Sequence, residues 1–301
     1  MRRLTDIFIK NRPADVLTII FLLFLIILCL IYYKNLPRAP FLISLYSSLI
    51  FAQIFLIKIK DKWKFPQLFY NIIFPVVCVL SIFDSLEWVV HYVNPDDIDP
   101  FLIYLDYLIF NAHPTVILEN IMHPVLTDIL QIAYSTYYFM PISLGIVLLK
   151  NKQKEAFEKS LFLILLCFYL SYLGYILFPA LGPRFTIDHL QNYELEGFIV
   201  AEPIQNLLNR LEGIKRDAFP SGHTGIALLV AYLAFKFSRR LFWLLIPFVS
   251  LLIFSTVYCR YHYVVDIFAG IGLTVITIMP GEFLYDLWTK SERLAKLSAP
   301  S

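Results

Sequence analysis

The sequence has little charge and few cysteines. Only 16% of its 301 residues are charged, whereas 59% are hydrophobic and 17% are aromatic, a balance that water-soluble domains of this length rarely show. The net charge is only +2, and the basic residues cluster between apolar runs without lining one surface, so nucleic acid is not an expected partner. Of the four cysteines, only Cys259 falls near the end of an apolar run. This placement suggests neither a disulfide framework nor a Cys/His metal site, and we expect no metal or other cofactor.

Long apolar runs make up most of the chain. Several reach the roughly 20 residues that a helix needs to cross a hydrocarbon core about 30 Å thick. We therefore predict an all-α fold, a polytopic bundle of transmembrane helices. Eight spans are expected, near residues 15–33, 40–58, 67–92, 127–149, 160–178, 223–236, 241–258 and 262–285. The first span follows a basic leader and no small-x-small cleavage site comes after it, so we interpret it as a retained anchor. The leader contains Arg2, Arg3, Lys10 and Arg12.

The basic residues indicate how the spans are oriented. After the leader they form four clusters in alternate loops, at 58–64, 150–159, 236–240 and 290–296. The positive-inside rule places these clusters and both termini in the cytoplasm. Two external loops depart from the rule: the short first one holds Lys34 and Arg38, and the long one at 179–222 holds Arg184, Arg210, Lys215 and Arg216. An anion bound at the long loop would explain the larger exception.

Residues 100–126 are apolar, but acidic residues, histidines and prolines interrupt them. This pattern predicts short helices that lie at the outer interface and do not cross the membrane. Such helices either cover an opening between spans or only seal the outer surface of the bundle, and the sequence favours neither.

A P-S-G-H sequence stands where the sixth apolar run begins. Ser221 and Gly222 are therefore expected at a helix N-terminus. The free backbone N–H groups, the close approach that glycine allows, the serine hydroxyl and the helix dipole together suit a phosphate. A serine N-cap followed by a turn glycine would explain P-S-G equally well.

His262 and Asp266 open the last span, four residues apart and hence on one helical face. A carboxylate that holds one ring nitrogen of His262 would fix the tautomer and make the other nitrogen more nucleophilic. The alternative is a pair that only stabilises the helix. Because ionisable residues in a membrane span are costly, the functional interpretation is favoured.

Arg184 follows the fifth span in the segment G-P-R, and its guanidinium offers a bidentate fork to phosphate oxygens. A single interfacial arginine is usually only a membrane anchor. The predicted topology, however, brings a larger set of polar residues to the same outer face: Arg184, Lys215, Arg216, His223, Arg260, His262 and Asp266.

Together these motifs resemble the type 2 phosphatidic acid phosphatase superfamily, with P-S-G-H at 220–223 and H-x3-D at 262–266 in the same order. Two features depart from the family pattern. Leu177 replaces the lysine expected seven positions before Arg184, and Thr256 stands where an arginine is expected, with Arg260 four residues later. These variations are more similar to the inositol phosphorylceramide synthase-like branch, whose members transfer a phosphoryl headgroup between lipids.

The resemblance implies a metal-independent membrane enzyme that acts on a lipid phosphate or phosphodiester. His262 would attack phosphorus to form a phosphohistidine, Asp266 would orient it, and His223 would protonate the leaving oxygen and later activate the acceptor. The phosphate oxygens would be held by Arg184, Lys215, Arg216, Ser221, Gly222 and Arg260. A water acceptor makes the protein a lipid phosphatase and an alcohol acceptor makes it a headgroup phosphotransferase; a non-catalytic lipid-phosphate scaffold or a transporter is the alternative.

The resemblance also implies a division of the chain into three parts. Residues 1–66 would form the leader and two additional spans, 67–289 a catalytic domain with a six-helix phosphatase core, and 290–301 a cytoplasmic tail. Two polar stripes in the third and fourth spans would line its cavity and read the headgroup, or only form hydrogen bonds between helices. The stripes are Asp84, Glu87 and His91, and Gln131, Tyr134 and Tyr138.

Overall fold

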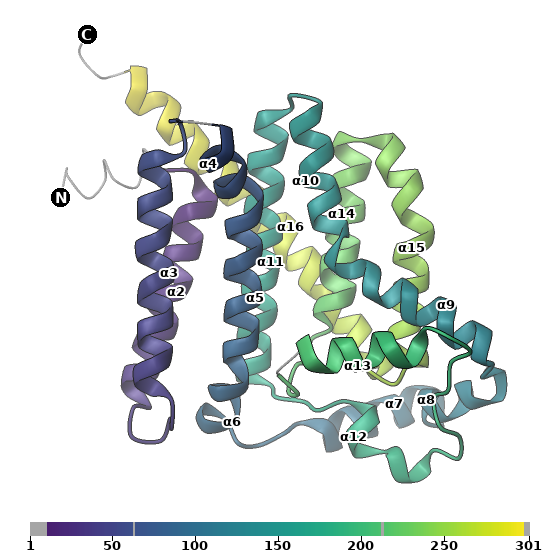
Figure 1. The fold of residues 1–301 in the computed structure, drawn as a ribbon. Coiled ribbons are helices and arrows are strands. Elements are labelled where there is room, and N and C mark those ends of the chain that lie inside the picture. The colour runs from purple at the N-terminus through teal and green to yellow at the C-terminus, as the bar shows by residue number, and fades with distance from the viewer. Residues whose placement is uncertain (1–10, 63, 212–213, 298–301) are drawn as a thin grey trace.

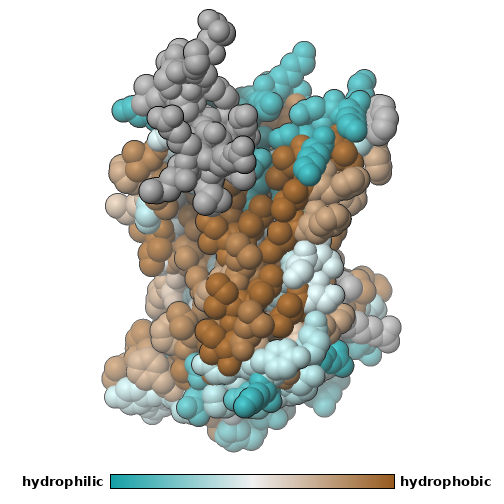
Figure 2. Space-filling model, turned by 90° about the vertical axis from the view of Figure 1, so that its left-hand side faces the viewer, coloured by the Kyte–Doolittle hydropathy of each residue, from teal (hydrophilic) through white to brown (hydrophobic). Residues whose placement is uncertain are grey.

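The computed structural model describes residues 11–62, 64–211 and 214–297, which form helices and no strand. The leader residues Arg2, Arg3 and Lys10 lie outside the described residues. Figure 1 shows a bundle of long helices with short helices gathered across one end. Apolar side chains cover the middle of the face in Figure 2, with polar side chains toward both ends. The protein is therefore an integral multi-pass membrane protein.

Two N-terminal helices, α2 (Pro13–Ile31) and α3 (Ala39–Ile59), pack against each other beside the rest of the bundle. A buried carboxylate, Asp15, joins them to it. It accepts hydrogen bonds from Arg12 Nε at 2.8 Å, from Gln53 Nε2 at 2.7 Å and from the Tyr70 hydroxyl. Buried charges persist where they are paired in this way, so the network fixes the α2–α3 hairpin to the following helix.

The third predicted span, 67–92, is one long helix with two local irregularities. It comprises α4 (Lys64–Leu68), a π-helical turn (Phe69–Ile73), α5 (Phe74–Ser85), a 3-10 turn (Leu86–Trp88) and α6 (Val90–Val93). Pro75 has no N–H to continue the helical ladder, which accounts for the π-helical turn before it.

The fourth predicted span, 127–149, is not one straight helix. It consists of α9 (Pro124–Ser135), a 3-10 turn (Thr136–Tyr138) and α10 (Met140–Lys150), and the chain bends by 51° between the two halves. Pro141 at the start of α10 cannot donate a hydrogen bond to the preceding turn, so the proline breaks the continuous helix that apolar patterning predicted.

The remaining spans are α11 (Lys154–Leu177), α14 (Gly222–Phe237), α15 (Arg239–Tyr258) and α16 (Val264–Leu297). Six of the described helical stretches are long and apolar enough to cross a membrane; the bent α9–α10 pair and the shorter α14 complete the eight predicted spans. α14 packs against α11, α15 and α16 at the centre of the bundle. Gly225 and Gly270 permit the close approach of α14 and α16, because a Cβ on Gly225 would come within 2.9 Å of Leu273.

Short helices lie across the end of the bundle opposite to the last described turns of α16 (Figure 1). They are α7 (Asp99–Phe110), α8 (Pro114–Ile117) with the 3-10 turn Leu118–Ile121, and two helices of the long loop, α12 (Pro183–Thr186) and α13 (Ala201–Leu211). α7 packs against α16, α8 against α15 and α13 against α9. The segment predicted to be interfacial thus covers the helix ends that carry the motif residues.

Candidate active site

Two histidines from different elements meet beneath the short helices. His262 lies in the turn between α15 and α16, and His223 is the second residue of α14. The Nε2 atom of His262 is 3.3 Å from Nδ1 of His223. Both side chains are buried, with exposures of 3% and 7%. The fold therefore brings together the two histidines that the sequence predicted to act together.

The partners of His262 determine which of its nitrogens carries the proton. Its Nδ1 lies 2.8 Å from the carbonyl oxygen of Ala218, which can only accept a hydrogen bond. We therefore assign the proton to Nδ1, which leaves the lone pair of Nε2 directed at His223. His223 then donates from Nδ1, and its Nε2 has no hydrogen-bond partner among the residues that the structure describes.

Asp266 serves both His262 and the start of α16. Its Oδ2 is 3.4 Å from Nδ1 of His262 and accepts a hydrogen bond of 2.9 Å from the backbone N–H of Tyr263. Tyr263 precedes the first helical residue, so this is the backward half of a capping box. The carbonyl of Ala218, at 2.8 Å, is the closer partner of Nδ1, and sequence reasoning did not identify it because backbone acceptors leave no signature.

The surroundings keep His262 uncharged. The pKa of His262 is lowered to about 4, chiefly by burial; Asp217 and the Ala218 carbonyl raise it, and the positive charge of Arg184 adds to the lowering. At neutral pH the imidazole therefore has a free lone pair, which is the form that a nucleophile requires.

Arg184 is held next to this pair by the G-P-R loop. Gly182 adopts φ +87°, and a Cβ there would come within 2.6 Å of the Tyr261 carbonyl oxygen, so only glycine fits. The backbone N–H of Arg184 donates to the carbonyl oxygen of Arg260 at 3.1 Å. The loop thereby packs against the turn that carries His262.

Two of the other predicted phosphate-binding cations, Arg216 and Arg260, form ion pairs with carboxylates. Arg216 forms a bidentate pair with Asp97, at 2.7 and 3.1 Å. The Arg260 guanidinium donates to Glu119 at 2.9 Å and to the Tyr193 carbonyl at 2.7 Å. These pairs join the loops around the site.

Lys215, Ser221 and Gly222 complete the predicted phosphate-binding set. The Lys215 side chain is exposed. The Ser221 hydroxyl acts as the N-cap of α14, because it accepts the Thr224 N–H at 3.2 Å. Gly222 packs directly under the Tyr175 hydroxyl, where a Cβ would clash.

Two carboxylates of α7 support the site. Asp99 accepts the N–H groups of Leu181 and Gly182, each at 2.8 Å, and the Tyr263 hydroxyl at 2.8 Å. Asp106 accepts the N–H groups that begin α16, from Val264 at 3.0 Å and Val265 at 2.9 Å. The only signal in the sequence was their spacing of seven residues within an apolar segment, which places both on one helical face.

The polar stripe of the third span is divided between different surroundings. Asp84 lines a cavity, Glu87 accepts the backbone N–H of Lys215 at 3.2 Å, and the His91 side chain is exposed. These three residues therefore do not share one site.

The stripe of the fourth span lies beside the histidines. Gln131 donates to the Tyr261 hydroxyl at 2.7 Å, and Tyr134 stacks on Tyr261 with its centroid 4.6 Å from that of His223. Tyr138 lines the same cavity as Asp84. The hydrogen bond of Gln131 thus joins α9 to the turn that carries His262.

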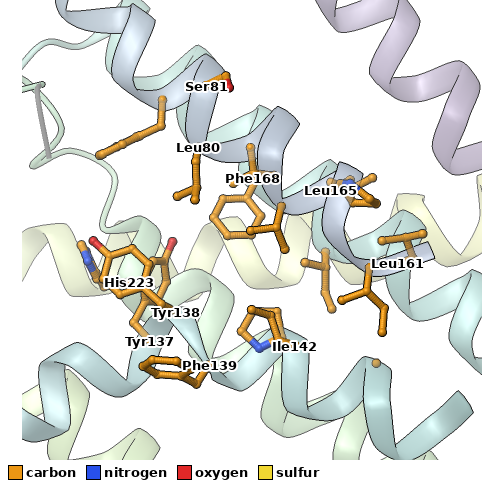
Figure 3. A pocket seen from close by; sticks show the side chains of 18 of the residues that line it. Leu80, Ser81, Tyr137, Tyr138, Phe139, Ile142, Leu161, Leu165, Phe168 and His223 are labelled. Atoms are coloured by element: carbon orange, nitrogen blue, oxygen red, sulfur yellow. The ribbon is translucent and has the colours of Figure 1, made fainter. Parts of the chain in front are cut away.

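The cavity has a volume of about 770 Å³ and lies between α5 and the α9–α10 bend, with α11 as its back wall. In Figure 3, His223, Tyr137 and Tyr138 lie at one end, and Leu161 and Leu165 lie toward the other. His223 thus belongs to both the histidine pair and the cavity wall.

Comparisons with known proteins agree with this geometry. Residues 104–279 match the family model of the PAP2 superfamily, a range that includes both histidines. A PA-phosphatase related-family protein of Dictyostelium discoideum is 25% identical over 177 residues, which are 52% of this chain and 32% of that protein. The chain therefore spans about a third of the length of that relative. No solved structure matches the chain. Because the family model covers more than half of the sequence, the protein belongs to the PAP2 superfamily.

Proposed function

We propose that the protein cleaves the phosphoester bond of a membrane lipid phosphate, with His262 as the nucleophile. The observation that supports this most directly is the pairing of the His262 Nε2 lone pair with Nδ1 of His223 at 3.3 Å. The two rings are therefore close enough to contact one phosphoryl group, His262 as the nucleophile and His223 as the acid for the oxygen that leaves on the opposite side of phosphorus. The family is consistent with lipid phosphatase chemistry.

In the first step, Nε2 of His262 attacks phosphorus while the bond between phosphorus and the lipid oxygen breaks. The leaving oxygen takes a proton from Nε2 of His223, which acts as the imidazolium and is left as a neutral ring, and departs as a lipid alcohol. The positive imidazole ring of the phosphohistidine is stabilised by the Ala218 carbonyl and by Asp266, both on the Nδ1 side. In the second step, water gives a proton to His223 and attacks phosphorus, which releases phosphate and restores His262.

The charge on the phosphoryl oxygens requires donors close to both histidines. In this proposal Arg184 and the first N–H groups of α14, at Gly222, supply them. Arg216, Arg260 and Lys215 contribute positive potential from the rim, where Asp97 and Glu119 hold the two guanidinium groups.

The test is phosphate release from a lipid phosphate in detergent micelles, with His262→Ala and His223→Ala beside the wild type. His189→Ala is the matched control, since that side chain is 68% exposed. We expect the two site variants to lose at least a hundredfold in turnover and the control to match the wild type. Turnover by His262→Ala equal to the wild type would refute the mechanism, and lipid binding without turnover in any protein would favour a scaffold or transporter.

Transfer of the phosphoryl group to an alcohol is the second candidate. It is favoured by the burial of both histidines and by the departures from the phosphatase pattern, which are more similar to the inositol phosphorylceramide synthase-like branch. Exclusion of water from the phosphohistidine would give an alcohol acceptor the advantage. A lipid phosphate labelled in its phosphoryl group and offered with inositol, glycerol or a long-chain alcohol distinguishes the two outcomes, because hydrolysis gives labelled inorganic phosphate and transfer gives a labelled phosphate ester of the alcohol.

We further propose that the site faces the extracytoplasmic side and that both termini are cytoplasmic, as the basic loops predict. Asp188→Cys provides the test, since Asp188 is 70% exposed and the four native cysteines are buried. A thiol reagent confined to the exterior should label this variant in intact cells and leave the wild type unlabelled. Labelling only after permeabilisation would reverse the orientation.

A further inference from the structure

The cavity beside His223 extends far into the bundle. Its wall on α11 runs from Phe157 to Tyr175, which at 1.5 Å per residue is about 27 Å. A hydrocarbon core is about 30 Å thick, so the cavity crosses most of the membrane-spanning part of the bundle. A site for a headgroup alone would not need this length.

The two ends of the cavity differ in polarity. At the histidine end it is lined by Asp84, Ser135, Tyr137 and Tyr138. Beyond Phe168 the wall is mostly hydrocarbon, for example Ile142, Leu161 and Leu165 (Figure 3), with Asn71 and Ser160 as its polar residues. One polar end and a long apolar body match an amphiphile whose polar group lies at His223.

The helix arrangement gives such a ligand a route from the bilayer. α5 packs against α3 and α11, and α10 packs against α11 and α14. The cavity therefore separates α5 from α10. At the polar end α13 covers it with Ile204 and Leu207, and Asp128 holds the start of α13 through the N–H groups of residues 199–201 at 2.8 to 3.1 Å.

We propose that this cavity binds one long hydrocarbon chain of the substrate, the chain attached to the oxygen that leaves phosphorus. The assignment rests on the proposed function. Of the two histidines, His223 lines the cavity, and its Nε2 is buried without a hydrogen-bond partner among the described residues. Because His223 protonates the leaving oxygen, the alcohol formed there has its chain in the cavity.

The size of the cavity restricts the ligand to one chain. About 770 Å³ is the volume of a site for a drug-sized molecule, which suits a single extended chain and not the two chains and glycerol of a whole phospholipid. A second chain, where the substrate has one, remains in the bilayer between α5 and α10.

The far end of the cavity then sets a limit on chain length. A chain that moves from lipid into an apolar cavity gains little from the hydrophobic effect, since both surroundings are equally apolar. Discrimination must come from the far end, where Gly145 of α10 faces Phe157 of α11 and both line the cavity. A Cβ on Gly145 would lie 3.4 Å from the Phe157 ring, so a small side chain fits and a larger one fills the end of the cavity.

Photo-crosslinking tests the assignment without turnover. Octyl and octadecyl phosphate, each with a diazirine at the chain terminus, are bound to the wild type and to His262→Ala, irradiated, and the labelled peptides are identified. We expect octadecyl label on the α10–α11 end, at residues 145–161, and octyl label nearer Phe168. Gly145→Leu should reduce octadecyl labelling at least fivefold and leave octyl labelling unchanged. Ile146→Phe is the control, because Ile146 does not line the cavity.

Each outcome bears on one claim. Label on residues outside the cavity wall, or equal labelling of Gly145→Leu and the wild type, would overturn the assignment. If Gly145→Leu does not fold, Leu161→Trp blocks the same end from α11 and replaces it. Specific labelling without phosphate release from any lipid phosphate would keep the chain site and refute the proposed function. A bound bilayer lipid that octadecyl phosphate cannot displace would also overturn the assignment.

Discussion

Asp99→Asn tests whether a residue outside the motifs positions the catalytic groups. The Asp99 carboxylate is 2% exposed and accepts three hydrogen bonds of 2.8 Å, from the backbone of Leu181 and Gly182 and from the Tyr263 hydroxyl. An asparagine keeps one acceptor oxygen and turns an NH₂ group toward the remaining donors. At least one bond is therefore lost.

The loss can be given a magnitude. A hydrogen bond to a charged group contributes about 1.5 to 3 kcal/mol. If this is lost entirely from the transition state, kcat falls about 10-fold to about 150-fold. The residues affected are two positions from Arg184 and adjacent to His262, so we expect kcat to fall while KM changes little.

The assay is phosphate release from a lipid phosphate over a range of substrate concentrations, with the melting temperature measured in the same detergent. Asp188→Asn is the control, since that side chain is 70% exposed and its carboxylate accepts fewer hydrogen bonds than that of Asp99. Tyr263→Phe should reproduce part of the loss, because it removes one of the three donors. A lower melting temperature with an unchanged kcat would show that Asp99 supports only the fold and would refute the reasoning.

Three further predictions concern His262, Gly222 and the N-terminal hairpin. Because burial lowers the pKa of His262 to about 4, the unfolded chain binds a proton below pH 6.5 that the folded protein does not, so stability falls as pH falls. This loss of folding free energy is about 2 kcal/mol at pH 5. The melting temperature of the wild type should therefore drop more than that of His262→Asn between pH 7 and pH 5. Equal drops in the two proteins would contradict this. Gly222→Ala should lose activity and about 1 to 3 kcal/mol of stability, because the added Cβ meets the Tyr175 hydroxyl. Adding Tyr175→Phe to this variant should restore part of the activity and part of the stability. If it restores neither, the steric explanation is wrong. Asp15→Ala leaves Arg12 buried without its main partner, so thermal denaturation should show a loss of about 3 to 5 kcal/mol of stability. Initial rates should show unchanged turnover per folded molecule. Reduced turnover would place the hairpin within the catalytic domain.

The spans and the histidine pair were predictable because their signals are local. Apolar length identified seven spans without correction, and the spacing of His262 and Asp266 indicated that they lie close together, although His262 precedes the first residue of α16 and is not on a helical face. The bend at residues 136–139 was missed because the bend residues are themselves aromatic or neutral and continue the apolar pattern. Hydropathy measures how apolar a run is and not whether it is straight.

The partners of the charged residues were not predictable. Arg216 and Arg260 have the chemistry of phosphate ligands, but the fold places Asp97 and Glu119 against them. The roles of Asp99 and Asp106 depend on donors that lie 82 to 164 positions away in sequence. A charged side chain in a membrane protein must find a partner, and only the tertiary structure decides which one.

The α9–α10 bend has a consequence for the rigidity of the substrate site. A broken helix leaves backbone carbonyls without their usual partners, and no water in the hydrocarbon region replaces them. Here the hydroxyls of Ser135 and Thr136 donate to the carbonyls of Ile132 and Ala133, at 2.7 and 2.6 Å. Both carbonyls also accept the backbone N–H of Thr136, so the two hydroxyls reinforce the last turn before the bend. The space between α5 and α10 is accordingly part of the resting shape of the protein, so a lipid would enter a preformed site and would not have to separate the helices.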